Sequence, residues 1–161
     1  MKFILSSILF VFLAPCNKPK NISNSAATDN SKAIIIYQAG ACFGRCPEYT
    51  LTITGENKTV VFKGDRNTDK IGTYTKQITD KDLSNFISSF ENAKFNSLEN
   101  EYLGTITDFP IKTITYTNKG NTKSIKERSG APEALITLEK SLKEYAENVE
   151  GWKKSEDVDN H

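Results

Sequence analysis

The sequence predicts an α+β domain with a mainly antiparallel sheet of about six strands in the order ββββ-α-ββ-α, and with its helices packed on one face of the sheet. Three observations lead to this class. Short segments rich in β-branched residues follow one another through short polar turns, which favours hairpins. Two other segments place apolar residues at helical spacing. No segment repeats another with matching residues, so one domain is expected.

Four strands are expected before the first helix. The clearest is the second, in which Tyr49, Leu51 and Ile53 alternate with threonines, as the two faces of a half-buried strand do. Isolated glycines and short polar stretches between the segments indicate turns. The four strands are expected at residues 33–37, 49–54, 59–63 and 73–78.

Two amphipathic helices are expected. Thr79 can cap the first, with Asp80 and Asp82 in its first turn near the positive end of the helix dipole. The second begins near Pro132, a residue favoured at the first helical position. The buried stripes are Leu83, Phe86, Ile87 and Phe90 in the first helix and Leu135, Leu138, Leu142 and Tyr145 in the second.

Between the helices lie a hairpin and a long loop. Residues 111–117 and 122–126 are expected to pair around a turn at residues 118–121. The preceding segment, residues 96–108, is mostly polar and shows no repeating pattern. Loops of this length inside a compact domain are often functional or mobile, so this one is a candidate binding segment.

The first sixteen residues are typical of an export signal. Lys2 precedes an apolar stretch that is too short to span a bilayer stably. The stretch ends in Leu13-Ala14-Pro15-Cys16, which resembles a bacterial lipobox, the motif whose cysteine is lipidated and becomes the new N-terminus. Pro15 departs from that motif, in which a small residue is usual. The alternative is an ordinary secretory leader from which Cys16 is discarded.

The remaining chain divides by composition. Residues 17–31 are small and polar and are expected to be a flexible tether. Residues 32–152 form the single α+β domain, and the charged residues 153–161 are expected to be a disordered tail. The protein is therefore expected to be exported and held in the cell envelope, its contact with the membrane being the lipid on Cys16.

Cys42 and Cys46 are expected to form a structural disulfide, because an exported protein meets oxidising conditions. A disulfide needs Cα atoms roughly 4.4–6.8 Å apart, so the backbone must turn between the two cysteines. Gly44 permits this turn, and Pro47 favours an extended conformation at Cys46. A redox-active pair, a metal site and free thiols remain as alternatives.

Composition excludes several functions. Lys and Arg total 21 against 20 Asp and Glu, so the chain lacks the basic field that a general nucleic-acid binder needs. The single histidine, His161, lies in the polar tail, which excludes Ser-His-Asp and Cys-His catalysis and leaves a zinc site short of ligands. No glycine-rich phosphate loop is present, and no metal or cofactor is expected. A carboxylate pair could be drawn from Glu99, Glu101, Asp108 and Glu133, but their spacing selects no pair.

The segment Cys42-Phe43-Gly44-Arg45-Cys46-Pro47-Glu48-Tyr49 resembles the opening motif of an uncharacterised family of bacterial envelope proteins, the domain of unknown function numbered 6438. Residues 106–110, residues 130–133 and Trp152 fit the same family. The resemblance covers about residues 33–152 and implies a small lipoprotein domain. It implies no activity, cofactor or partner.

The predicted function is that of a non-catalytic, lipid-anchored envelope domain that binds another envelope protein or a small ligand. Elimination of the core positions leaves the cysteine loop and the long loop, so Arg45, Tyr102 and Asp108 are the candidate binding residues. Tyr102 and Phe109 could form a binding lip, or they could cover the core. The alternatives are a thiol–disulfide redox protein that uses Cys42 and Cys46 and a structural lipoprotein.

Overall fold

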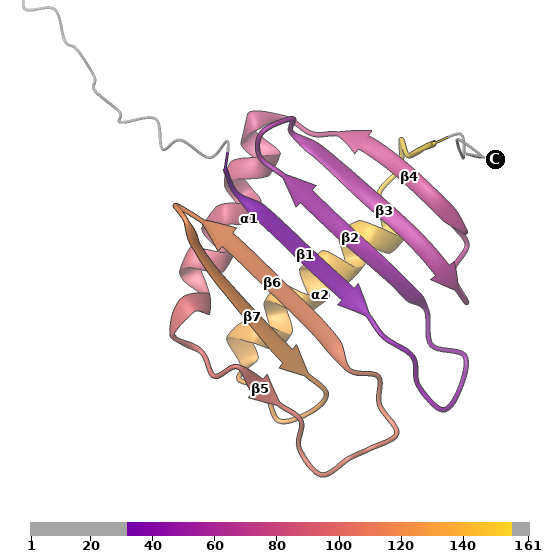
Figure 1. Cartoon of the computed structure of the whole chain (residues 1–161), viewed down its shortest axis with the longest axis vertical. Coiled ribbons are helices and arrows are strands. Elements are labelled where there is room, and N and C mark those ends of the chain that lie inside the picture. Colours follow the sequence, from indigo (N-terminus) through magenta and orange to yellow (C-terminus); the bar gives the residue numbers. More distant parts are fainter. Residues whose placement is uncertain (1–31, 156–161) are drawn as a thin grey trace, which may run out of the picture.

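The structure, a computed structural model, describes residues 32–155, which form one eight-stranded sheet, two α-helices and a short 3-10 helix (Figure 1). The strands lie in the order β5-β7-β6-β1-β2-β3-β4-β8. All neighbouring strands are antiparallel except β5 and β7. The α+β class and the mainly antiparallel sheet are confirmed. The elements are β1 (Ile34–Ala39), β2 (Glu48–Thr54), β3 (Thr59–Arg66), β4 (Gly72–Gln77), α1 (Asp80–Asn92), η1 (Phe95–Ser97), β5 (Glu101–Tyr102), β6 (Lys112–Asn118), β7 (Asn121–Glu127), α2 (Glu133–Asn148) and β8 (Lys153–Lys154).

The expected number of about six strands is wrong for the described residues, because two short strands extend the sheet at its edges. β5 pairs with β7, and β8 pairs with β4. Each has two residues, too few to show an alternating pattern. β5 lies in the long loop, and β8 lies at the start of the expected disordered tail, so the tail boundary at residue 153 is also corrected. The signal segment, the tether, Cys16 and His161 lie outside the described residues.

The core lies between the sheet and the two helices, which Figure 1 shows on the same side of the sheet. Alternate residues of the central strands are buried, among them Leu51 and Phe62. Phe90 of α1 stacks on Tyr116 of β6 with ring centroids 4.5 Å apart, which joins a helix directly to the sheet. Burying a large apolar side chain stabilises a fold by roughly 1.5–3 kcal/mol, so this layer supplies most of the driving force.

The helices begin where the sequence predicts. The hydroxyl of Thr79 accepts a hydrogen bond from the amide of Asp82 (3.2 Å), and the carboxylate of Asp82 accepts one from the amide of Thr79 (3.0 Å). The carboxylate of Asp82 accepts a further hydrogen bond from the hydroxyl of Thr79 (2.7 Å), and the two bonds from the amide and hydroxyl of Thr79 lower the pKa of Asp82 below its usual value. Pro132 directly precedes α2. No helix within residues 32–155 is long and apolar enough to cross a membrane.

The chain that follows α2 packs against the core through Trp152. Trp152 packs against Phe62 and Tyr145, with ring centroids 5.8 Å and 6.2 Å away. The ammonium of Lys76 donates to the carbonyl of Glu150. Burial raises the pKa of Tyr145 to about 12. The described chain therefore remains part of the packed domain up to β8.

A buried ion cluster joins the sheet to α2. The ammonium of Lys112, at the start of β6, lies 2.6 Å from a carboxylate oxygen of Glu127 and 2.6 Å from one of Glu139. Glu127 ends β7, and Glu139 lies in the middle of α2; both are buried. Burial alone lowers the pKa of Lys112, but the two ion pairs outweigh it and raise that pKa above its usual value. Burial has the opposite effect on a carboxyl group, and it raises the pKa of Glu139.

Replacement of Lys112 by methionine (Lys112→Met) is expected to lower the free energy of unfolding by about 3–5 kcal/mol at neutral pH, because it leaves two buried carboxylates unpaired. Lys140→Met is the matched control. Lys140 is an exposed lysine of α2, 3.8 Å from Glu144, and its loss should cost no more than about 0.5 kcal/mol. Urea unfolding of the two variants measures the difference.

The pH dependence separates this ion cluster from simple packing. The pKa of Lys112 is raised in the folded state, so its stabilisation is present at neutral pH and is lost only as the pH rises through that raised value. The pKa of Glu139 is also raised, so its ionisation costs stability, and acid removes that cost. The deficit of Lys112→Met should therefore shrink as the pH falls below about 5. A deficit that stays constant between pH 4 and 8 would contradict the charge argument.

Candidate functional site

Two loops meet at one end of the sheet, beyond β1, β6 and β7 (Figure 1). The first, residues 40–47, joins β1 to β2, and the second, residues 103–111, joins β5 to β6. Between them lies an open cavity of about 420 Å³, called here the end cavity. It is lined by Gly40, Ala41, Cys42, Phe43, Thr107, Phe109, Ile111 and Arg128.

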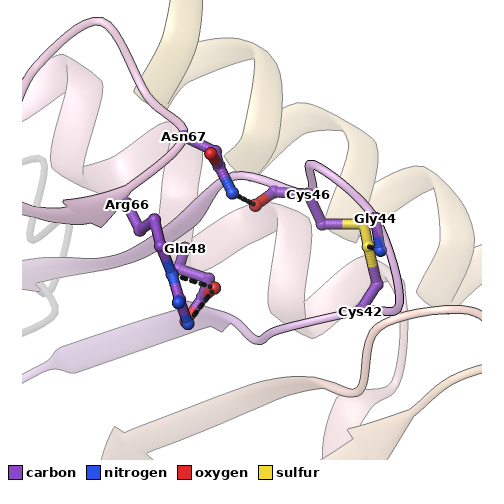
Figure 2. Close-up of a disulfide and its surroundings, with 6 residues drawn as sticks. All are labelled: Cys42, Gly44, Cys46, Glu48, Arg66 and Asn67. Carbon is purple, nitrogen blue, oxygen red and sulfur yellow. Dashed lines mark hydrogen bonds and ion pairs between the residues drawn. A yellow bond between two sulfur atoms is a disulfide. The ribbon is translucent and has the colours of Figure 1, made fainter.

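The first loop is held at its base by a crosslink and by polar contacts with the end of β3, which Figure 2 shows. Cys42 and Cys46 form a disulfide with Cα atoms 5.7 Å apart, which is consistent with the predicted crosslink. The side-chain amide of Asn67 donates to the carbonyl of Cys46 (3.1 Å). The guanidinium of Arg66 lies 2.8 Å from the carboxylate of Glu48. These contacts fix both ends of the loop while leaving its tip free.

Glycines allow the second loop to approach its neighbours. The amide of Gly40 donates to the carbonyl of Ile111 (3.1 Å), and a Cβ at Gly40 would lie only 2.5 Å from that oxygen. Gly104 has a φ of +52°, and a Cβ there would lie 2.0 Å from the hydroxyl of Ser129. A Cβ at Gly40 would force the two backbones apart, so the close approach of Gly40 and Ile111, which both line the end cavity, depends on this glycine.

The rim of the end cavity is apolar and open to water. Phe43, at the tip of the crosslinked loop, is 92% exposed, and Phe109 is 55% exposed. Ile106 and Ile111 on the second loop are exposed as well. Single exposed apolar residues are common on protein surfaces, but a group of them around a cavity is typical of an interaction site.

Arg128 supplies the charge of the end cavity, and it is the only charged residue in the lining. Its Nε atom is buried and has no hydrogen-bond acceptor among residues 32–155. Within the same residues its guanidinium forms no ion pair, and the carboxylate of the neighbouring Glu127 is bound to Lys112. The cavity therefore combines an apolar rim with an unpaired cation.

The structure brings the two predicted loops together, but Arg45, Tyr102 and Asp108 are not among the residues that line the cavity. Arg45 and Asp108 are exposed, and Asp108 accepts a 3.5 Å hydrogen bond from the hydroxyl of Thr107. Tyr102 is half-buried and packs against the core, while its hydroxyl accepts a hydrogen bond from the amide of Glu99 (2.9 Å). Of the two aromatic residues considered for a binding lip, Phe109 lines the end cavity and Tyr102 does not.

Sequence reasoning did not select Phe43 or Arg128. For Phe43 a signal exists, because a phenylalanine in a short polar loop between two cysteines has no helical or strand periodicity that would bury it. For Arg128 the sequence offers no such signal, since an arginine after a strand is usually solvated.

The surroundings of the disulfide limit its chemistry. It lies between two strands and not at the start of a helix, where a thiolate is stabilised. Among residues 32–155, the one hydrogen bond to either sulfur comes from the amide of Gly44 to Cys42 (3.2 Å). Nowhere in that range do three His, Cys, Asp or Glu side chains come together as a metal site requires.

A protein-family model matches most of the chain. The family model described as DUF6438, a domain of unknown function, matches residues 33–146, which is more than two thirds of the chain. This confirms the resemblance to the family. No curated protein matches the sequence.

Removal of the crosslink by Cys42→Ser/Cys46→Ser is expected to lower the free energy of unfolding by about 2 kcal/mol, because the closed loop is short. Urea unfolding without reductant measures this loss. The unaltered protein treated with reductant should lose about the same amount, and the variant should not respond to reductant. A variant as stable as the unaltered protein would show that the crosslink does not constrain the loop.

Proposed function

The chain belongs to the DUF6438 family, a domain of unknown function, and from this premise we propose that it is a non-catalytic binding domain of the cell envelope. Its end cavity receives an apolar group from a partner. The single observation that carries the proposal is the pair of exposed phenylalanines, Phe43 and Phe109, on the wall of a cavity that also contains Arg128.

The energetics of the rim favour binding. An exposed phenylalanine gains roughly 1.5–3 kcal/mol when it is fully buried, so covering Phe43 and Phe109 would contribute strongly to affinity. The crosslink between Cys42 and Cys46 and the bond from Gly40 to Ile111 hold both loops in place before the partner arrives. This lowers the entropy that would be lost on binding. Aromatic and arginine side chains are also the residues that dominate binding energies at interfaces.

The location in the envelope is part of the same proposal. Leu13-Ala14-Pro15-Cys16 supports a lipid anchor on Cys16, and the polar residues 17–31 would hold the domain away from the membrane surface. The partner is then another envelope protein, with a small envelope ligand as the second candidate. No contact of the described residues favours the redox or the structural alternative over binding.

Replacement of Phe43 by photoreactive benzoylphenylalanine in the full chain, expressed in its own cells, is expected to yield a discrete crosslinked species after irradiation. Position 109 should yield the same species, because both rings line one cavity. Ile136, which is 50% exposed on α2, is the control position for an apolar side chain that lies outside the cavity. Electrophoresis and mass spectrometry identify the crosslinked molecule.

Two results would overturn the binding proposal. One is equal crosslinking at positions 43, 109 and 136, which would indicate non-specific collision. The other is the absence of crosslinks at both 43 and 109 in protein that is correctly located. Phe43→Ala and Phe109→Ala should leave the free energy of unfolding within about 0.5 kcal/mol, since both side chains are exposed.

Cys16→Ser is expected to release the full-length protein from membranes into the soluble envelope fraction, because the lipid attached to that cysteine is the proposed anchor. Intact mass spectrometry of the unaltered, membrane-extracted protein should show an acylated chain that starts at Cys16. The matched control is Ser6→Ala, a change inside the signal segment that leaves the cysteine in place. A soluble, unmodified chain that starts elsewhere would contradict the anchor.

A further inference from the structure

We propose that the end cavity recognises a carboxylate, and that its ligand is the C-terminal residue of a partner polypeptide. The apolar side chain of that residue lies against Phe43 and Phe109, and its terminal carboxylate binds the guanidinium of Arg128. This inference rests on the proposed function and specifies the chemistry of the partner.

The charge of the end cavity selects an anion. Arg128 is the only charged residue in the lining, and no carboxylate within residues 32–155 forms an ion pair with it. Its buried Nε atom has no acceptor in the same range. A buried donor without an acceptor is unfavourable, and the guanidinium donates to a carboxylate through two parallel hydrogen bonds. A bound carboxylate would therefore pair the charge of the guanidinium.

Glu127 and Glu139 are already engaged by another cation. Glu127 directly precedes Arg128 in the sequence, but its oxygen lies 2.6 Å from the ammonium of Lys112. Glu139 lies at the same distance from that ammonium. Both carboxylates are buried and paired with Lys112, so neither of them neutralises the guanidinium. The cation of the cavity remains available for an external anion.

The size and the walls of the cavity favour a C-terminal residue over other carboxylates. In such a residue the carboxylate and the side chain are attached to one carbon, so both fit into a short cavity. The volume of about 420 Å³ lies near the lower end of small-molecule sites, which span roughly 300–1,000 Å³. A long aliphatic acid would fill the apolar part but would leave its chain in water.

The backbone of the second loop supplies the remaining partners that a peptide needs. Among residues 32–155, no hydrogen bond uses a backbone amide or carbonyl of residues 105–110. An entering peptide carries unpaired amides and carbonyls of its own, which require partners when they leave water. Capture of a terminal carboxylate together with backbone hydrogen bonding is a known mode of peptide recognition. An aliphatic acid could not use these groups.

Two labelled peptide pools test the proposal on the full chain by fluorescence anisotropy. Each pool has four variable residues followed by leucine or phenylalanine, and the pools differ only in ending as a free acid or as an amide. The free-acid pool should bind saturably, and amidation should weaken binding about tenfold or more, because it removes the charge that faces Arg128. This comparison uses the unaltered protein, so it does not depend on a variant that folds.

Arg128→Gln identifies the residue responsible. It should weaken binding of the free acid about tenfold and leave the amide nearly unchanged, so that the two pools bind this variant alike. Arg45→Gln is the matched control, because Arg45 is an exposed arginine of the crosslinked loop that does not line the cavity. It should preserve the difference between acid and amide. Thermal unfolding of both variants shows whether they are folded.

The outcomes separate this inference from the proposed function. If both pools bind equally and Phe43→Ala weakens both, the binding function stands and the carboxylate inference is overturned. If neither pool binds but dodecanoate binds in a manner that depends on Arg128, the ligand is an anionic lipid and the assignment to a polypeptide end is overturned. If the crosslinking at positions 43 and 109 also fails, the proposed function falls with it.

Discussion

The position of one ammonium group, that of Lys112, determines how this end of the domain is built. It lies 2.6 Å from carboxylate oxygens of both Glu127 and Glu139, and thereby joins the start of β6, the end of β7 and the middle of α2. A single buried carboxylate without a partner would be strongly unfavourable, so the three elements hold this geometry together. The adjoining residues in the chain, Ile111 and Arg128, begin the walls of the end cavity. The ammonium of Lys112 is therefore not part of the lining of the end cavity, but it helps to position two residues that are, Ile111 and Arg128.

In the first loop of the end cavity, residues 40–47, the base is held in place and the tip is exposed. The disulfide of Cys42 and the pair of Arg66 with Glu48 fasten the first loop, while Phe43 at its tip is exposed to water. Gly40 brings the second loop close enough for a backbone hydrogen bond. An exposed aromatic side chain on a rigid support loses little entropy when a partner covers it. The residues that stabilise this loop are thus different from Phe43, the residue proposed to contact a partner.

The sequence predicted what depends on local pattern and missed what depends on distant partners. The alternation in β2 and the cap at Thr79 follow from neighbouring residues, and the turn at Lys119 and Gly120 has the positive φ values, 51° and 80°, that a tight hairpin needs. The two-residue strands β5 and β8 have no pattern to detect. The place of Arg128 in the cavity lining could not be predicted either, because it depends on how two loops far apart in the sequence, residues 40–47 and 103–111, come together at the end of the sheet.

The sheet face that carries the threonines shows why the end cavity, and not this face, is the candidate site. Its β-branched residues are the types that strands favour for packing and backbone reasons alone, so their abundance needs no ligand. Several of the hydroxyls already satisfy one another across β6 and β7: Thr115 donates to Ser124 (3.0 Å), and Thr117 and Thr122 lie 2.9 Å apart. At the end cavity the reverse holds, because apolar rings face water and a buried donor of Arg128 has no acceptor among the described residues. A surface whose groups are satisfied gains little from a partner, whereas one with unburied rings and an unpaired cation gains from both.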